Sequence, residues 1–256
     1  MESDSQALST ILAREPFPIF RKASLRLVSR YYTLRCDPKQ AEGRFHEFDR
    51  LLGSVDSFSL GDVFPLPFIK GEQPTYLQSL DPSGVPVINT LAIQNLSINT
   101  EACRYIAQDD FDSLPEDRKL QQADILLTLD GGTSIGKPVL FNLEGDFTVD
   151  SHIALIRQPA LKPLTIVYLL ASPFGQIQFQ RAESGASGQT AVTEEDIRRF
   201  RFPKVSAQRL DLLVESLNAA LTTVNAQLLA AHEAEANAWR DFNKAMMGSR
   251  SPAGQC

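Results

Sequence analysis

The chain has 256 residues, of which 43% are hydrophobic and 22% charged, so it can bury a core without disulfides or metals. Its formal net charge of −6 argues against a free-standing nucleic-acid binder. The three cysteines and three histidines are scattered without metal-ligand spacing, which argues against a disulfide framework, a zinc site or metal catalysis.

This cysteine usage predicts reduced thiols in a cytoplasmic protein. We also expect no metal and no cofactor. The first residues, MESDSQALST, lack the basic stretch and apolar run of a secretory signal. The longest apolar run, residues 164–171, is too short to span a bilayer. We therefore expect no contact with a membrane.

Residues 1–56 are expected to form an N-terminal arm and a lead-in helix. The arm combines a short helical pattern, broken by two prolines, with the extended run SLRLVSRYYTLR. The helix is predicted to open at Asp37-Pro38 and to end at Gly53. Its apolar face would consist of Ala41, Phe45, Phe48 and Leu52.

Residues 57–205 consist of short β-like runs separated by Gly, Pro, Asn and Asp, which predicts a mixed, mainly-β domain of the α+β class. The runs expected to form strands include VPVINTLAI, DILLTL, PVLFN, HIALIR and LTIVYLL. Charge is unevenly spread, because residues 101–130 hold eight acidic and three basic side chains. The remainder of the chain is therefore close to neutral.

The turn between DILLTL and PVLFN, residues 131–137, fits the G-x-x-x-x-G-K part of a phosphate-binding loop. A working loop also needs a Ser or Thr after the Lys and the start of a helix. Here Pro138 follows Lys137 and a strand is predicted next, which disfavours a nucleotide-dependent enzyme. A Gly-rich hairpin is the better interpretation, with Thr133 and Lys137 at a tip that either contacts a ligand or is simply solvated.

His152 lies in VDSHIALIR, at the start of a predicted strand. A catalytic histidine needs a nucleophile and an orienting acid. The neighbouring Asp150 and Ser151 would point to opposite faces of a strand, which disfavours that role. His152 is better interpreted as a structural or a base-contacting polar group, and both remain open.

The segment QFQRAESGASGQTAVTEEDIRRFRFP predicts a flexible loop of small residues, followed by a short helix capped by Thr193 and Asp196. The loop is rich in donors, among them Arg181, Ser187 and Gln189. Arg and Gln side chains make bidentate contacts with base edges. The same composition also fits a disordered connection.

Residues 206–247 contain neither Pro nor Gly and predict one helix, about 63 Å long at 1.5 Å per residue. Apolar residues follow a heptad spacing that continues less regularly to Ala245. The clearest heptad positions are Leu210, Val214, Leu217, Leu221, Val224 and Leu228. This narrow seam favours a projecting helix that pairs with another; the alternative is an amphipathic helix lying on its own domain. Residues 248–256 are expected to be a disordered tail.

Taken in order, these motifs resemble the DNA-specificity subunits of type I restriction–modification systems. The resemblance runs from FSLGDVFPLPFIKGEQP through GVPVINTLAIQNLSI, LQQADILLTLDGGTSIGKPVLFN and DFTVDSHIALIRQP. It continues through YLLASPFGQIQFQ and SGASGQTAVTEEDIRRFRFPKV to the long helix. It implies a target-recognition domain at 57–205 and a conserved dimerisation or spacer helix at 206–247.

The resemblance also implies a non-enzymatic reader of double-stranded DNA that recruits methyltransferase subunits and possibly a restriction subunit. Full-length members carry two recognition domains and two helices, so this chain resembles a half-subunit. Two copies paired through the helix as a homodimer would rebuild the reader and recognise a bipartite, palindromic site.

Carried over loop by loop, the resemblance assigns candidate DNA contacts to nine residues. They are Lys70, Gln73, Thr90, Thr133, Lys137, His152, Arg181, Ser187 and Gln189. A DNA reader should gather them on one positive face of the fold. An assembly protein on the same fold without DNA readout should leave them scattered or on an acidic face.

Overall fold

The computed structural model describes residues 42–78, 84–94, 96–131, 134–183 and 190–248. The N-terminal arm and the tail lie outside the described residues, as do Ala41, Thr133, Ser187 and Gln189. The chain divides into two compact units, Met1–Val205 and Ser206–Cys256, and each is described by itself.

The first unit contains strands and helices in mixed order. Its strands are β1 (Ser57–Ser59), β2 (Ile69–Lys70), β3 (Val85–Ile88), β4 (Ile93–Gln94), β5 (Ser97–Ile98), β6 (Arg104–Ile106), β7 (Ile125–Thr128), β8 (Pro138–Leu140), β9 (Thr148–Val149), β10 (Ile153–Ile156) and β11 (Arg201–Pro203). Its α-helices are α3 (Gly43–Gly53), α4 (Gln108–Asp112), α5 (Pro163–Ala171), α6 (Pro173–Ala182) and α7 (Glu194–Arg198). Short 3-10 helices span Leu60–Val63, Thr100–Ala102 and Glu116–Arg118.

The main sheet has the strand order β2-β10-β7-β8, with every neighbouring pair antiparallel. Every residue of β7 and β10 is buried, because the sheet is covered on both faces. Leu126, Ile153 and Leu155 of these strands join Phe141, Phe147 and Ile88 in one core cluster, and α5 packs along β8 and β7. The runs DILLTL, PVLFN and HIALIR therefore form strands, as predicted.

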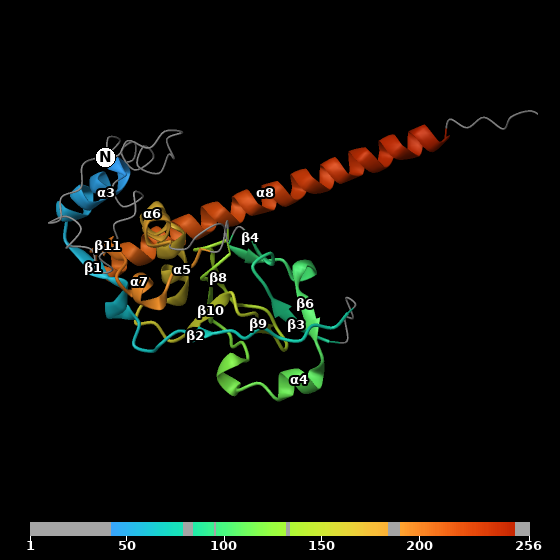
Figure 1. The fold of residues 1–256 in the computed structure, drawn as a ribbon. Coiled ribbons are helices and arrows are strands. Elements are labelled where there is room, and N and C mark those ends of the chain that lie inside the picture. The colour runs from blue at the N-terminus through green and yellow to red at the C-terminus, as the bar shows by residue number, and fades with distance from the viewer. Residues whose placement is uncertain (1–41, 79–83, 95, 132–133, 184–189, 249–256) are drawn as a thin grey trace, which may run out of the picture. The chain divides into compact units, whose positions relative to one another are not determined.

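A second sheet has the order β6-β3-β9, in which β3 and β9 are parallel. It packs against the main sheet, since Ile88 and Val149 share one core cluster with Leu126 and Leu155. β1 and β11 pair antiparallel, and β4 forms a small hairpin with β5. Figure 1 shows the main sheet between two groups of elements: α3, α6, β1 and β11 at one end, and β3, β6 and α4 at the other.

Helix α3 confirms the apolar face that the sequence predicts, because Phe45, Phe48 and Leu52 are buried against Ile177 of α6. The predicted helix start at Pro38 is wrong. Glu42 has an extended backbone, with φ −62° and ψ 135°, and is the N-cap residue of the helix. The Glu42 carbonyl accepts the Phe45 N–H at 3.2 Å, and this hydrogen bond closes the first turn of the helix.

The run LTIVYLL is a helix, α5, and the prediction of a strand there is wrong. Pro163 occupies the first turn, where its fixed φ suits a helix and its missing N–H costs nothing. Ile166, Val167 and Leu170 are all buried. A helix buried on most of its surface loses the 3.6-residue alternation, so its sequence resembles a buried strand.

The second unit is the helix α8 (Ala207–Gly248), which confirms the long helix expected at 206–247. Its 42 residues span about 63 Å. Leu217, Val224 and Leu228, three of the heptad positions, keep 44%, 46% and 49% of their surface exposed. Within the described residues, neither this helix nor any other is long and apolar enough to cross a membrane.

Candidate functional site

One end of the main sheet is polar, and its residues come from three neighbouring strands. β10 starts with Ile153 opposite Thr128, the last residue of β7, and Lys70 at the end of β2 pairs with Ala154. This register brings together the residues that follow β2 and β7 and those that precede β10. We call this group the polar edge; it consists of Lys70, Gln73, Asp130, Ser151 and His152.

Asp130 is at the centre of the polar edge. One carboxylate oxygen contacts Nδ1 of His152, and the other lies 3.6 Å from Nζ of Lys70. The side chains of Lys70 and His152 are 57% and 48% exposed, whereas that of Asp130 is 23% exposed. Asp130 therefore holds two of the predicted contact residues at the surface, although the sequence analysis did not single it out.

Gln73 joins the polar edge through Ser151, whose hydroxyl donates to the Gln73 side-chain oxygen at 3.2 Å. Gln73 also hydrogen-bonds the phenol of Tyr76. Burial raises the pKa of Tyr76, the Asp150 carboxylate adds to this, and Arg104 and Gln73 oppose it. The Arg104 guanidinium stacks 3.4 Å above the centre of the Tyr76 ring, so the polar surface continues onto β6.

The turn before β10 is fixed by Asp150, which is only 4% exposed. Its carboxylate accepts the backbone N–H of His152 at 3.0 Å. Burial raises the pKa of Asp150; the hydrogen bond and charge of His152 lower it, and the charge of Asp130 raises it further. Asp150 and Ser151 were expected to point to opposite faces of a strand, whereas Asp150 lies in the turn before β10 and supports the His152 backbone.

Gly71 allows β2 to approach this turn. Its N–H donates to the Ile153 carbonyl at 3.0 Å. A Cβ at Gly71 would lie 2.1 Å from the Asp150 carbonyl oxygen, well inside van der Waals contact. No side chain fits at this position, so the close approach that places Lys70 beside Asp130 requires glycine.

The Gly-rich turn is a hairpin between β7 and β8, as predicted, with Ile125 opposite Leu140. A strand follows Lys137 where a phosphate-binding loop would begin a helix. The Lys137 N–H donates to the buried Thr128 hydroxyl at 2.9 Å. Lys137 is therefore anchored by its backbone beside the end of β7, close to the polar edge.

The chain returns to the polar edge after the donor-rich loop. Thr190 accepts the Gly131 N–H at 3.3 Å, and Val192 donates to the Leu129 carbonyl at 2.8 Å. The capping box of Thr193 and Asp196 forms at the start of α7, as predicted. The segment that follows Ser187 and Gln189 therefore runs along the end of β7, although those two residues themselves are outside the described part.

Arg181 lies elsewhere. It belongs to α6, so the prediction that it sits in a flexible loop is wrong. Its guanidinium makes two hydrogen bonds with the Asp49 carboxylate, at 2.8 and 3.2 Å, and its side chain is 16% exposed. Arg181 thus ties α6 to α3.

Thr90 lies in the turn after β3, half-buried. Asn89 closes that turn by accepting the backbone N–H groups of Leu91 and Ala92 at 2.9 and 3.1 Å. The turn is two residues from the hydrogen bond between Ile88 and Asp150, so Thr90 borders the polar edge rather than joining its network.

The opposite end of the same strands is closed by a different ion pair. Arg157, after β10, binds Asp124, before β7, with two hydrogen bonds of 2.7 and 2.8 Å. Here the side chains are 11% and 3% exposed, so the pair is buried and structural. In the Asp130–His152 pair the histidine is 48% exposed, so this pair can meet a ligand.

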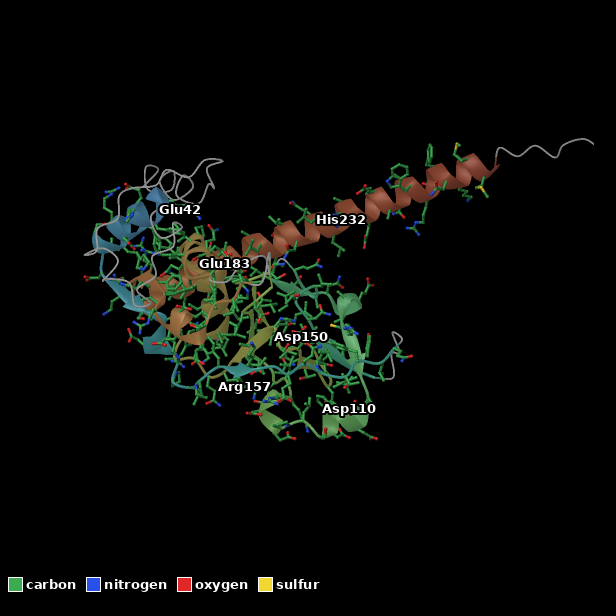
Figure 2. All side chains as sticks on the ribbon, viewed as in Figure 1. Glu42, Asp110, Asp150, Arg157, Glu183 and His232 are labelled. Atoms are coloured by element: carbon green, nitrogen blue, oxygen red, sulfur yellow. The ribbon has the colours of Figure 1, made fainter. Side chains whose placement is uncertain are left out.

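Of the eight acidic residues at 101–130, three lie on α4, namely Asp109, Asp110 and Asp112, while Asp124 belongs to the buried pair and Asp130 to the polar edge. Figure 2 shows Asp110 of α4 at the other side of the body from Glu183, which accepts the Thr190 hydroxyl at 2.7 Å. No group of three or more His, Cys, Asp or Glu side chains in the described part of the chain could hold a metal ion.

No protein-family model matches the sequence, and no curated protein is similar to it. Solved structures do resemble the fold. A chain from work on complex assembly and conformational transition of the type I restriction–modification system is 15% identical, with a TM-score of 0.48 over 95% of this chain and 54% of that one. The HsdS subunit from Thermoanaerobacter tengcongensis is 15% identical, with a TM-score of 0.45 over 91% and 53%.

The type IIG restriction endonuclease BpuSI is 10% identical, with a TM-score of 0.51 over 85% of this chain and 33% of that one. At this identity the likeness concerns the fold: mixed sheets followed by a long helix. The chain spans about half the length of the first type I structure that it matches.

Proposed function

We propose that this chain is a DNA-recognition module that reads base edges of double-stranded DNA with its polar edge. The observation that carries the proposal is the gathering of Lys70 and Gln73, from the segment at the end of β2, with His152, before β10, beside the hairpin of Lys137. A glutamine can read a base, and a lysine can neutralise a phosphate. The shared fold with BpuSI, a restriction endonuclease, supports DNA as the ligand.

The width of the polar edge supports the major groove as its binding site. Adjacent strands lie about 4.8 Å apart, so the ends of β2, β10 and β7 span about 10 Å. The major groove of B-DNA is about 12 Å wide and the minor groove about 6 Å. A three-strand edge therefore fits the major groove, where all four base pairs differ in their hydrogen-bonding patterns.

The net charge of −6 is compatible with this role when other subunits supply the phosphate contacts. We propose that methyltransferase subunits supply most of the phosphate contacts, while this chain supplies base readout. Phosphate contacts position a protein on DNA, whereas base contacts give specificity. On this proposal the chain is a non-catalytic specificity subunit, and a restriction subunit is a further partner.

We also propose that two copies pair through α8 and read a bipartite site. Leu217, Val224 and Leu228 follow the heptad spacing and are about half exposed in the single chain. An apolar seam at this spacing is buried when two helices pair. The alternative is an assembly protein that pairs through α8 but reads no DNA. A DNA-binding measurement distinguishes the two proposals.

Lys137→Ala is expected to weaken binding to every DNA sequence alike, because a lysine on a phosphate carries no sequence information. The slope of log affinity against log salt should fall in magnitude by about 1. Fluorescence anisotropy of labelled duplexes at several salt concentrations measures both quantities. Lys119→Ala, which removes one positive charge at the opposite end of the sheet, should leave them unchanged; equal losses in both variants would exclude a specific role for Lys137.

Replacing both Leu217 and Val224 by aspartate is expected to separate the paired chains. Each buried Leu or Val contributes about 1.5–3 kcal/mol, so the dimer dissociation constant should rise by roughly 100-fold or more. Sedimentation equilibrium measures the change. The control replaces Thr222 and Thr223, outside the heptad seam, by aspartate and adds the same charge. Unaltered association of the first variant would contradict pairing through this seam.

A further inference from the structure

The contact between His152 and Asp130 determines which ring nitrogen of the histidine carries hydrogen. An ionised carboxylate has only acceptors, so Nδ1 of His152 must donate to it. The second oxygen of Asp130 faces the Lys70 ammonium, which likewise has only donors. Asp130 thus accepts from both neighbours, and the neutral form of His152 carries its hydrogen on Nδ1.

The backbone of His152 is held on both sides, so the ring is presented from a fixed point. Its N–H donates to the Asp150 carboxylate at 3.0 Å, and its carbonyl accepts the Leu129 N–H at 2.9 Å. The side chain nevertheless keeps 48% of its surface exposed. With Nδ1 engaged, Nε2 carries a lone pair that can accept a hydrogen bond from a ligand.

We propose that Asp130 is a positioning residue that fixes this tautomer of His152, so that Nε2 accepts a hydrogen bond from an exocyclic base amine. This inference rests on the proposed function. In the major groove only adenine N6 and cytosine N4 offer amine donors, whereas guanine and thymine offer acceptors at the corresponding edges. His152 therefore selects adenine or cytosine at one position of the contacted strand, by on the order of tenfold over guanine or thymine.

Asp130→Asn tests the assignment because the side-chain amide is nearly the same size but can donate. An asparagine N–H₂ facing Nδ1 makes that nitrogen the acceptor and places the hydrogen on Nε2. His152 would then present a donor, and the preferred base should change toward guanine or thymine. Asp130→Glu keeps a carboxylate acceptor and should keep the wild-type preference.

The first readout needs no DNA. Long-range ¹H–¹⁵N NMR of the full chain at about pH 8, where an imidazole in water is neutral, distinguishes the two tautomers of His152. We expect hydrogen on Nδ1 in the wild type and on Nε2 in Asp130→Asn. Hydrogen on Nε2 in the wild type would overturn the proposal whatever the DNA data show.

The second readout is DNA selection with the full chain and the subunits that copurify with it. One position should change base preference in Asp130→Asn, while Asp110→Asn on α4 should behave as wild type. Asp130→Asn also weakens the ion pair with Lys70, but this changes the affinity for all DNA sequences alike. It can therefore be distinguished from a change of base preference at one position. An unchanged preference in Asp130→Asn would overturn the reading role of His152.

The two readouts separate this inference from the proposed function. If the wild type selects no DNA sequence, the proposed function and the base-reading role both fail, and NMR alone decides the tautomer. If the wild type selects a site but His152 carries its hydrogen on Nε2, the proposed DNA recognition is retained and the role of Asp130 is rejected.

Discussion

Asp124→Ala is expected to destabilise the first unit by about 3–5 kcal/mol, because it leaves the Arg157 guanidinium buried without its counter-charge. The two side chains are 3% and 11% exposed. The guanidinium also donates to the carbonyls of Asp117 and Lys119 at 2.8 and 2.7 Å, so it cannot leave without breaking further bonds. Urea denaturation followed by circular dichroism measures the loss.

Two further variants give this prediction its control. Glu116→Ala removes an 86%-exposed carboxylate that pairs with Lys119, and it should change stability little. Combining Asp124→Ala with Arg157→Met removes both buried charges, so the double variant should be more stable than Asp124→Ala alone. A double variant that loses the sum of both single effects would show that the pair does not act as a unit.

Gly71→Ala is expected to disrupt the polar edge and to lower stability by about 1–3 kcal/mol or more. The added Cβ would meet three backbone atoms, the nearest at 2.1 Å, so β2 must move away from the turn at Asp150. Backbone atoms cannot rotate aside as a side chain can. Thermal unfolding measures the stability, and DNA affinity should fall because Lys70 moves with β2.

Gly53→Ala is the matched control, since nothing lies within 4 Å of a Cβ at that position in α3. Alanine is a better helix former than glycine, by up to about 1 kcal/mol, so this variant should be as stable as the wild type or more so. Equal stability of the Gly71→Ala and wild-type proteins would show that β2 does not pack against the turn as described.

Local signals made much of the fold predictable. The hairpin of β7 and β8 follows from two apolar runs around a Gly-rich turn, and α8 follows from a long heptad pattern without Pro or Gly. α5 was missed because burial on most of its surface removes the helical period from LTIVYLL. The start of α3 was missed because the extended conformation of Glu42 leaves no trace in the sequence.

The polar edge was only partly predictable, because it depends on the register between distant strands. Lys70 and His152 were assigned from separate motifs, whereas Asp130, which joins them, becomes visible only when β7 and β10 are paired. A polar residue directly after an apolar strand was the one available signal. For Arg181 the prediction of a DNA-contacting loop residue was misled by the sequence. Its ion-pair partner Asp49 is 132 residues away in the chain, so no local pattern shows that the two side chains meet.

The measurement that tests the central claim most directly is DNA selection by the complete complex, with variants of the polar edge beside a control variant on α4. We expect the wild type to enrich a defined bipartite sequence, and Gln73→Ala and His152→Ala to lose preference at single positions while binding persists. Asp110→Asn should select the wild-type sequence. Selection that returns no sequence, or the same sequence from every variant, would contradict base readout by the polar edge.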